Sequence, residues 1–202
     1  MSARYVVFEG GEGCGKSTQS ARFADSLAAC HTREPGGTSI GGDIRRLLLD
    51  PATQGLDPRA EALLMAADRA QHAAEVVAPA LAAGRHVVSD RSAYSSLAYQ
   101  GYGRGLPLEE IRSVSDWALQ GRWPDLVVLL EVPLAIADTR LDRERDRLEL
   151  EGPDFHQRVA DGFRALAAAE PDRFAVVDGT RSVDEVTAAV RAVLRDRLEL
   201  DA

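Results

Sequence analysis

The sequence predicts an α/β fold in which a five-stranded parallel sheet carries helices on both faces. Five short apolar runs have the length and the β-branched composition of buried strands. Helical patterns lie between them, and continuous apolar strands that alternate with helices are typical of a covered parallel sheet. The 202 residues suffice for one domain, so we expect a single unit over 1–202. The expected strands are 4–8, 30–33, 86–89, 126–132 and 174–177.

The helices are expected from periodic Ala- and Leu-rich segments and from the signals at their ends. A long helix over 58–83 is followed by Gly84, and glycine is the usual residue just past a helix end. Ser182 and Glu185 form a capping-box pattern that opens the last helix. The expected helices are 17–29, 58–83, 108–120, 153–169 and 182–200.

Polar residues stand at the carboxyl ends of the expected strands. In open α/β sheets, ligands bind beyond this edge. We therefore expect the functional site there. The residues concerned are 9–12, 33–34, 90–91, Glu131 and Asp178.

Composition and charge exclude several classes of function. The net charge of −8 disfavours general binding to nucleic acid or to an anionic membrane. No apolar run reaches the length of a bilayer span, and the chain runs from Met1 into a strand without a leader pattern. Cys14 and Cys30 are too few for a disulfide framework. We expect a cytoplasmic protein that acts on small molecules.

One glycine-rich segment carries the clearest chemical signal. Residues 10–17 read Gly-Gly-Glu-Gly-Cys-Gly-Lys-Ser, a G-x-x-x-x-G-K-[ST] pattern with a chance occurrence of roughly one in a thousand. Lys16 is the only lysine in the chain, and all other basic residues are arginine. A compact ammonium fits between phosphates inside a tight backbone loop, where a planar guanidinium does not.

The flanking elements support a phosphate site. A strand before the loop and a helix after it direct free N–H groups toward a bound anion. The loop therefore predicts that the chain binds a nucleoside triphosphate. The residues expected to bind ATP are Gly10, Gly11, Glu12, Gly13, Cys14, Gly15, Lys16, Ser17 and Thr18.

The rest of the chain narrows the class of triphosphate-binding protein. A guanine-specific GTPase needs an Asn-Lys-x-Asp sequence, and the single lysine is already used in the loop. Large motor and AAA-type ATPases need more chain and a second subdomain. A small protein with an arginine-rich segment at 140–147 points instead to the nucleotide and small-molecule kinases.

Four segments, in the same order and at similar spacing, resemble motifs of the bacterial thymidylate kinases, which are P-loop nucleoside monophosphate kinases. They are the loop 8–18, Thr-Arg-Glu-Pro-Gly-Gly-Thr at 32–38, Asp-Arg at 90–91 with Tyr-Gln-Gly at 99–101, and Asp-Arg-Leu-Glu at 146–149. The resemblance covers about 4–194. It implies a P-loop NTPase fold and transfer of the γ-phosphoryl of ATP to dTMP, giving dTDP, with Mg²⁺ and in a homodimer.

The loop motif and the resemblance assign roles to single residues. Ser17 is the expected Mg²⁺ ligand, and the resemblance adds Asp90 as support for the metal. The resemblance implies that Glu12 acts near Mg²⁺ and the acceptor nucleotide, and a carboxylate beside phosphates is costly unless a cation or a sugar hydroxyl meets it; the alternative is a side chain in solvent. The residues implied in catalysis are Lys16, Glu12, Arg91, Arg143 and Arg147.

The resemblance also implies a site for thymine. In the family, an arginine at the position of Arg69 meets O4 of the base, and Ser96 and Gln100 match a pair at its N3 edge. These two residues are four apart on an expected helix and so share a face; the alternative is that they are exposed. Met65 stands where the family usually has phenylalanine and is a less rigid platform for a base. The residues implied in dTMP binding are Glu12, Arg45, Met65, Arg69, Arg91, Ser96 and Gln100.

An arginine-rich segment is expected to form a short lid at about 141–152. Arg140, Arg143 and Arg147 are spaced i, i+3, i+7 and share one face if the segment is helical. The family carries its catalytic arginine either in the phosphate loop or in the lid, and loop position 13 is glycine here. The lid then supplies the charge, and such arginines contribute about 10³–10⁵ in rate. The alternative is a solvated helix with intrahelical ion pairs.

Two other functions stay open from the sequence. A deoxynucleoside kinase or another nucleoside monophosphate kinase would use the same loop with a different acceptor. A non-catalytic nucleotide-binding protein would bind ATP without turnover.

Overall fold

The computed structural model describes residues 2–141 and 144–201. The strands are β1 (Tyr5–Glu9), β2 (Cys30–Arg33), β3 (Val87–Asp90), β4 (Leu126–Glu131) and β5 (Phe174–Asp178). They form a parallel sheet in the order β2-β3-β1-β4-β5. The predicted five-stranded parallel sheet is confirmed.

The helical elements are α1 (Lys16–Ser26), α2 (Ser39–Leu49), α3 (Pro58–His72), η1 (Ala73–Val77), α4 (Ala78–Ala82), α5 (Ala93–Ser96), η2 (Leu97–Gly103), α6 (Leu108–Leu119), α7 (Leu134–Thr139), α8 (Pro153–Ala169) and α9 (Val183–Leu198). The expected long helix is present as α3, η1 and α4, with a π-helical turn between the two α-helices. The first helix ends earlier than expected because Ala28 has a φ of 47°, which no α-helix continues. Among the described residues, no helix combines the length and the apolar character that crossing a membrane requires.

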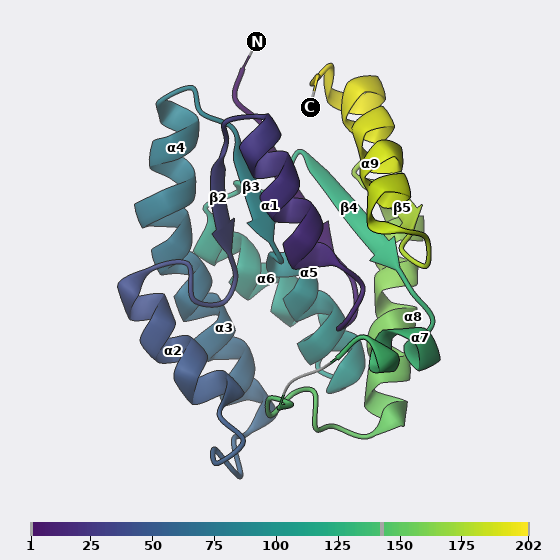
Figure 1. The fold of residues 1–202 in the computed structure, drawn as a ribbon. Helices are drawn as coiled ribbons and strands as arrows, with labels where there is room; N and C mark the ends of the chain where they lie inside the picture. Colours follow the sequence, from purple (N-terminus) through teal and green to yellow (C-terminus); the bar gives the residue numbers. More distant parts are fainter. Residues whose placement is uncertain (1, 142–143, 202) are drawn as a thin grey trace.

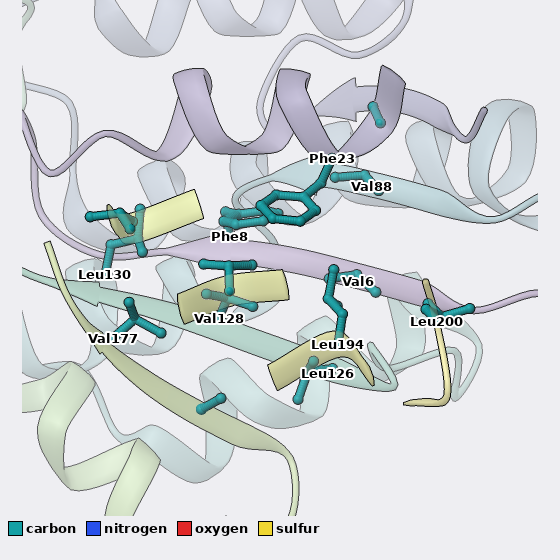
Figure 2. Packing of buried hydrophobic residues seen from close by; sticks show 14 of the residues in the cluster. Val6, Phe8, Phe23, Val88, Leu126, Val128, Leu130, Val177, Leu194 and Leu200 are labelled. Atoms are coloured by element: carbon teal, nitrogen blue, oxygen red, sulfur yellow. The ribbon is translucent and has the colours of Figure 1, made fainter. Parts of the chain in front are cut away.

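The central strand is buried on both faces because helices cover the sheet from both sides (Figure 1). Successive residues of a strand point to opposite faces. Phe8 stacks with Phe23 of α1, and Leu194 of α9 belongs to the same buried cluster (Figure 2). Val7 packs on the other face, with Val77 of η1. The apolar residues of β1 are therefore buried on both faces of the sheet, and the polar residue at the end of the strand lies at the edge of the sheet.

The parallel register brings three strand ends together. Phe8 and Arg33 both lie opposite Asp90. The phosphate loop that follows β1 therefore starts beside the ends of β2 and β3, as the polar strand ends predict.

The described residues do not form the helix that the arginine spacing over 140–147 suggested for the lid segment. The last helix before this segment, α7, ends at Thr139, residues 144–146 have no regular structure, and 147–150 form a turn. Arg140 and Arg147 hold distant parts of the chain instead of sharing a helical face. Arg147 donates its backbone N–H to the carbonyl of Leu49, which draws the segment toward the end of α2. Arg143 lies outside the described residues.

Candidate active site

A cavity of about 630 Å³ lies at the carboxyl edge of the sheet. Part of its wall is formed by residues 12–18 of the phosphate loop and α1, which we call the loop side. The residues of the other part, which we call the base side, are Arg45, Met65, Arg69, Ser96 and Gln100. Asp90 and Arg91 also line the cavity. Gly10 and Gly11 line a neighbouring cavity of about 430 Å³ instead.

The shape of the phosphate loop requires glycine at two positions. Gly10 has a φ of 140°, and a Cβ there would lie 2.5 Å from the carbonyl oxygen of Leu130. Gly13 has a φ of 67°, and a Cβ there would lie 2.4 Å from the carbonyl oxygen of Ala137. Both glycines have a positive φ, which residues with a side chain rarely adopt. The loop is therefore pressed against β4 and α7, and an arginine at position 13 would displace it.

Lys16 opens α1 and is buried in the loop. Its Nζ donates to the carbonyl oxygen of Gly11 at 2.6 Å and to Sγ of Cys14 at 3.6 Å. Gly15, which precedes the helix, provides no side-chain cap, so the first N–H groups of α1 are open to an anion. An ammonium and a helix N-terminus thus meet on the loop side.

Ser17 and Asp90 offer two oxygen atoms for a hard cation. Ser17 Oγ donates to Asp90 Oδ2 at 2.5 Å. Among the described residues, no group of three or more His, Cys, Asp or Glu side chains could hold a metal alone. This donor set fits Mg²⁺, which usually keeps water and substrate phosphate oxygens as ligands beside one or two protein oxygens.

Arg91 connects the phosphate loop with the base side. Its guanidinium donates to Glu12, to Ser95 Oγ at 3.0 Å and to Tyr99 Oη at 3.2 Å, and it donates to the Gly10 carbonyl at 3.2 Å. Burial alone would lower the pKa of Arg91, but the charge of Glu12 raises it well above its usual value. Glu12 therefore faces a cation rather than bulk solvent.

Hydrogen bonds to Glu9 fix the turn that contains Arg91. This buried carboxylate accepts hydrogen bonds from Ser92 and Ser95, two from each residue, at 2.6–3.1 Å. Arg91 itself has a φ of 74°, an unfavourable conformation for a residue with a side chain. The four hydrogen bonds hold the turn in that conformation.

Arg69 is almost fully buried, 2% exposed, and most of its donors are used. Nε donates to Glu34 at 3.0 Å, and one Nη donates to Ser96 Oγ at 2.9 Å. Glu34 also contacts His72 Nδ1 at 2.9 Å. Burial would raise the pKa of Glu34, but Arg69 and then His72 bring it below its usual range. The orientation of the arginine is therefore set before any ligand binds.

Gln100 combines one satisfied and one unsatisfied polar group. Its Nε2 donates to Glu61 Oε1 at 2.9 Å. Its Oε1 is buried and has no hydrogen-bond partner among the described residues. A buried acceptor without a donor is rare, and each one costs about 1–3 kcal/mol. Because Gln100 lines the cavity, a bound ligand can supply the missing donor.

Arg45 has its charge available for an anion. It lies on α2 and donates to the carbonyl oxygen of Pro35 at 2.9 Å. Within 2–141 and 144–201, no carboxylate forms an ion pair with it. Burial, and then the nearby charge of Arg33, lower the pKa of Arg45. An anionic ligand would relieve both effects.

Arg140 and Arg147 have different partners in the described part of the chain. Arg140 lines the cavity and donates to the carbonyl oxygens of Gly179 at 2.9 Å and Thr180 at 3.3 Å. Arg147 donates to Glu61 Oε2 and to the Leu48 carbonyl, both at 2.7 Å, and does not line the cavity in the described conformation.

Several residues of the site were missed by the sequence analysis. The Tyr-Gln-Gly motif contained Tyr99, whose Oη donates to Glu12 at 3.0 Å, but no role was given to it. Asp68 precedes Arg69 and accepts from the Gly36 N–H at 2.8 Å, and burial raises its pKa to about 6. Its position on the inner face of an amphipathic helix was the available signal.

This arrangement defines the class of the protein. A parallel sheet carries at its carboxyl edge a glycine-rich loop, a buried lysine and an open helix N-terminus, which together form the triphosphate site of P-loop NTPases. One cavity continues from that loop to a base side with its own arginines, as a phosphotransferase with two substrates requires.

Comparison with known proteins gives the particular family. Residues 8–190 match the sequence profile described as Thymidylate kinase. Thymidylate kinase of Solidesulfovibrio magneticus is 50% identical over 94% of this chain and 98% of that protein. Thymidylate kinase of Bifidobacterium longum (strain DJO10A) is 48% identical over 97% and 99%. The crystal structure of thymidylate kinase from Ehrlichia chaffeensis has a TM-score of 0.79 and 31% identity, covering 96% of this chain and 99% of that one.

The chain belongs to the thymidylate kinase family. Membership confirms the resemblance noted in the motifs, the P-loop fold and the kinase class.

Proposed function

We propose that the cavity binds ATP at the loop side and dTMP at the base side, in line for direct transfer. The reaction is the transfer of the γ-phosphoryl of ATP to dTMP, which gives dTDP and ADP, a step toward dTTP. The observation that carries the assignment is the lining of one cavity by Lys16 and by Gln100, whose buried Oε1 lacks a donor. The N3–H of thymine is a donor of the required kind.

The phosphate loop and Lys16 hold the donor phosphates. Loop N–H groups, the N-terminus of α1 and the ammonium neutralise charge without having to reorganise. Arg140 and the loop before α9 line the same cavity and flank the adenine side of ATP. Ser17 and Asp90 hold Mg²⁺, which shields the charge of the polyphosphate when it is bound.

The acceptor is bound through its phosphate and its base. Arg45 pairs with the phosphate, Arg91 lies between the two phosphate groups, and Glu12 with Tyr99 orients Arg91. A phosphate monoester has a second pKa of about 6, so no general base is needed near pH 7. Arg69 and Ser96 face O4 and the N3 edge, and Met65 packs on the ring. Alignment and charge neutralisation then account for the rate.

The segment 141–152 closes over the phosphates as a lid. Arg143 and Arg147 supply its positive charge. Arg147 leaves Glu61 for this, and Arg104, which donates to the same carboxylate at 3.0 Å, keeps Glu61 paired. Closure also excludes water and so limits ATP hydrolysis.

The protein acts as a homodimer in the cytoplasm. Leu63 on α3 is 60% exposed and Trp117 on α6 is 81% exposed, and these two helices pack side by side. A second copy of the chain that packs on these two helices would cover both side chains, and contiguous apolar surface of this kind is typical of an interface. Cys14 and Cys30 are free thiols, which suits a reducing compartment.

An acceptor panel tests the proposed function. With ATP and Mg²⁺, kcat/KM is measured for dTMP, thymidine, dUMP, UMP, CMP and AMP. We expect dTMP to be used better than thymidine, because only a nucleotide offers a phosphate to Arg45, and better than CMP, because cytosine lacks the N3–H that Gln100 Oε1 requires. Thymidine used as well as dTMP would contradict the role of Arg45, and ATP binding without turnover would contradict catalysis.

A further inference from the structure

Glu61 is a buried carboxylate at the centre of a cluster beside the base side. It lies one helical turn before Met65 on α3 and is 0% exposed. Arg104 donates to it through Nε at 3.2 Å and Nη2 at 3.0 Å, and Arg147 donates at 2.7 Å. Gln100 donates to it as well, at 2.9 Å.

The charge of Glu61 is fixed by these donors. Burial would raise the pKa of Glu61, but the hydrogen bonds from Arg104, Gln100 and Arg147 outweigh it and bring the pKa below its usual value. Glu61 is therefore ionised near neutral pH. An ionised carboxylate accepts hydrogen bonds and donates none.

This charge determines which way the Gln100 amide is turned. A side-chain amide has one donor end and one acceptor end. The end that faces Glu61 has to be the NH₂ group, because a carbonyl oxygen there would meet a carboxylate oxygen. The carbonyl oxygen is thereby turned away from Glu61, and it is the atom left buried without a donor.

We propose that Glu61 is a specificity-determining positioning residue. It holds Gln100 with the carbonyl oxygen toward the base, so the site accepts a ring with N3–H and rejects a ring whose N3 is an acceptor. Thymine and uracil carry this N–H, and cytosine does not. The inference rests on the proposed contact between Gln100 and the base.

Two substrates isolate this effect. dTMP and 5-methyl-dCMP share the ring methyl, the sugar and the phosphate, and differ at N3 and the 4-substituent. Glu61→Gln can donate as well as accept, so it permits the Gln100 amide to turn. We expect the ratio of kcat/KM for dTMP over 5-methyl-dCMP to fall about 10- to 100-fold, mainly through the two KM values.

A matched control removes a neighbouring charge without touching Gln100. Glu151 pairs with Arg104 at 2.6 Å, as Glu61 does from its own side. Glu151→Gln is expected to keep the ratio within about twofold. If Glu61→Gln lowers kcat/KM for both substrates equally, Glu61 has a structural role alone and the inference is wrong.

Two further measurements separate the possible failures. Gln100→Leu should raise the KM for dTMP; an unchanged KM would overturn the proposed base contact together with this inference. In the wild-type protein, NMR should show the Gln100 side-chain N–H protons protected from exchange, with and without dTMP. Loss of that protection on dTMP binding would mean that the NH₂ group no longer donates to Glu61. That result would overturn the inference even if Glu61→Gln does not fold.

Discussion

The arginine side chains around the cavity differ in the number of hydrogen-bond partners that they have in the absence of substrate. Arg69 is tied to Glu34 and Ser96, whereas Arg45 has a single carbonyl partner among the described contacts. The partners of Arg69 favour recognition of a ligand of fixed shape, because they keep its guanidinium group from moving. The single partner of Arg45 leaves a positive charge for a mobile anion such as the acceptor phosphate.

Arg45→Ala should weaken dTMP binding about 10- to 100-fold, because charge-assisted hydrogen bonds contribute about 1.5–3 kcal/mol. ATP affinity should change less than about twofold. Calorimetric titration with each nucleotide measures both. Arg46→Ala is the matched control, since Arg46 is exposed and pairs with Asp43. Equal effects of the two variants would show that Arg45 does not bind the phosphate.

The sequence predicts the residues whose chemistry is local and misses those that depend on distant partners. The phosphate loop could be predicted because the strand, the glycine turn and the lysine are encoded by a few adjacent residues. Glu61 could not be assigned, because Gln100, its partner, is 39 residues away. An acidic residue near the start of a helix is usually an exposed charge that complements the helix dipole.

At the scale of elements, α3 organises the base side by holding its neighbours. Asp68 on α3 fixes Gly36 in the turn before α2, and the Pro35 carbonyl of that turn positions Arg45. The expected helix was correct, but its inner polar face was not recognised. In the lid, by contrast, the helical spacing of arginines failed as a predictor, because Arg140 and Arg147 have long-range partners.

Asp68 should make stability depend on pH in a distinctive direction. Burial raises its pKa from 3.8 to about 6, so the folded protein keeps a proton that the unfolded chain has lost. The free energy of unfolding should therefore fall by about 3 kcal/mol in total as pH rises from about 3, below the unfolded pKa, to about 7, above the folded pKa, and level off beyond that.

Asp68→Asn keeps an acceptor for the Gly36 N–H and should remove this dependence. Relative to wild type, it should gain up to about 3 kcal/mol at pH 7.5 and little at pH 4. Urea unfolding at several pH values measures the difference. The exposed residue Asp196 serves as control through Asp196→Asn. A parallel shift of the whole pH curve would contradict the raised pKa.

One substitution in the lid distinguishes two roles of Arg147, contact with the transferred phosphoryl group and pairing with Glu61. Arg147→Ala should lower kcat more than dTMP affinity if Arg147 moves onto the phosphoryl group. Steady-state kinetics and calorimetry together resolve this. A larger loss of affinity than of kcat would show that Arg147 serves the Glu61 cluster in which the structure places it.

At the scale of the whole molecule, the fold places two neighbouring cavities at the sheet edge and leaves large apolar side chains on the surface of α3 and α6, Leu63 and Trp117. Burial on both sheet faces made the architecture predictable from apolar periodicity. The surface could not be predicted, because the same periodicity does not distinguish an interface from a core.

Leu63→Glu should convert a dimer into monomers, because it places a charge in an apolar contact. Light scattering should give twice the 21.8 kDa chain mass for the wild type and one chain mass for the variant. Val176→Glu is the control, since Val176 is 54% exposed on β5, away from those helices. A monomeric wild type would remove the proposed interface.

The proposed reaction requires separate loop and base sides within one cavity, and Lys16→Ala tests this directly. The variant should lose kcat by orders of magnitude, because no other residue on the loop side of the described cavity brings an ammonium to the phosphates. Its affinity for dTMP, measured by calorimetry, should stay within a few-fold of wild type, because the base side is untouched. Turnover close to wild type, or loss of dTMP binding together with turnover, would contradict the account.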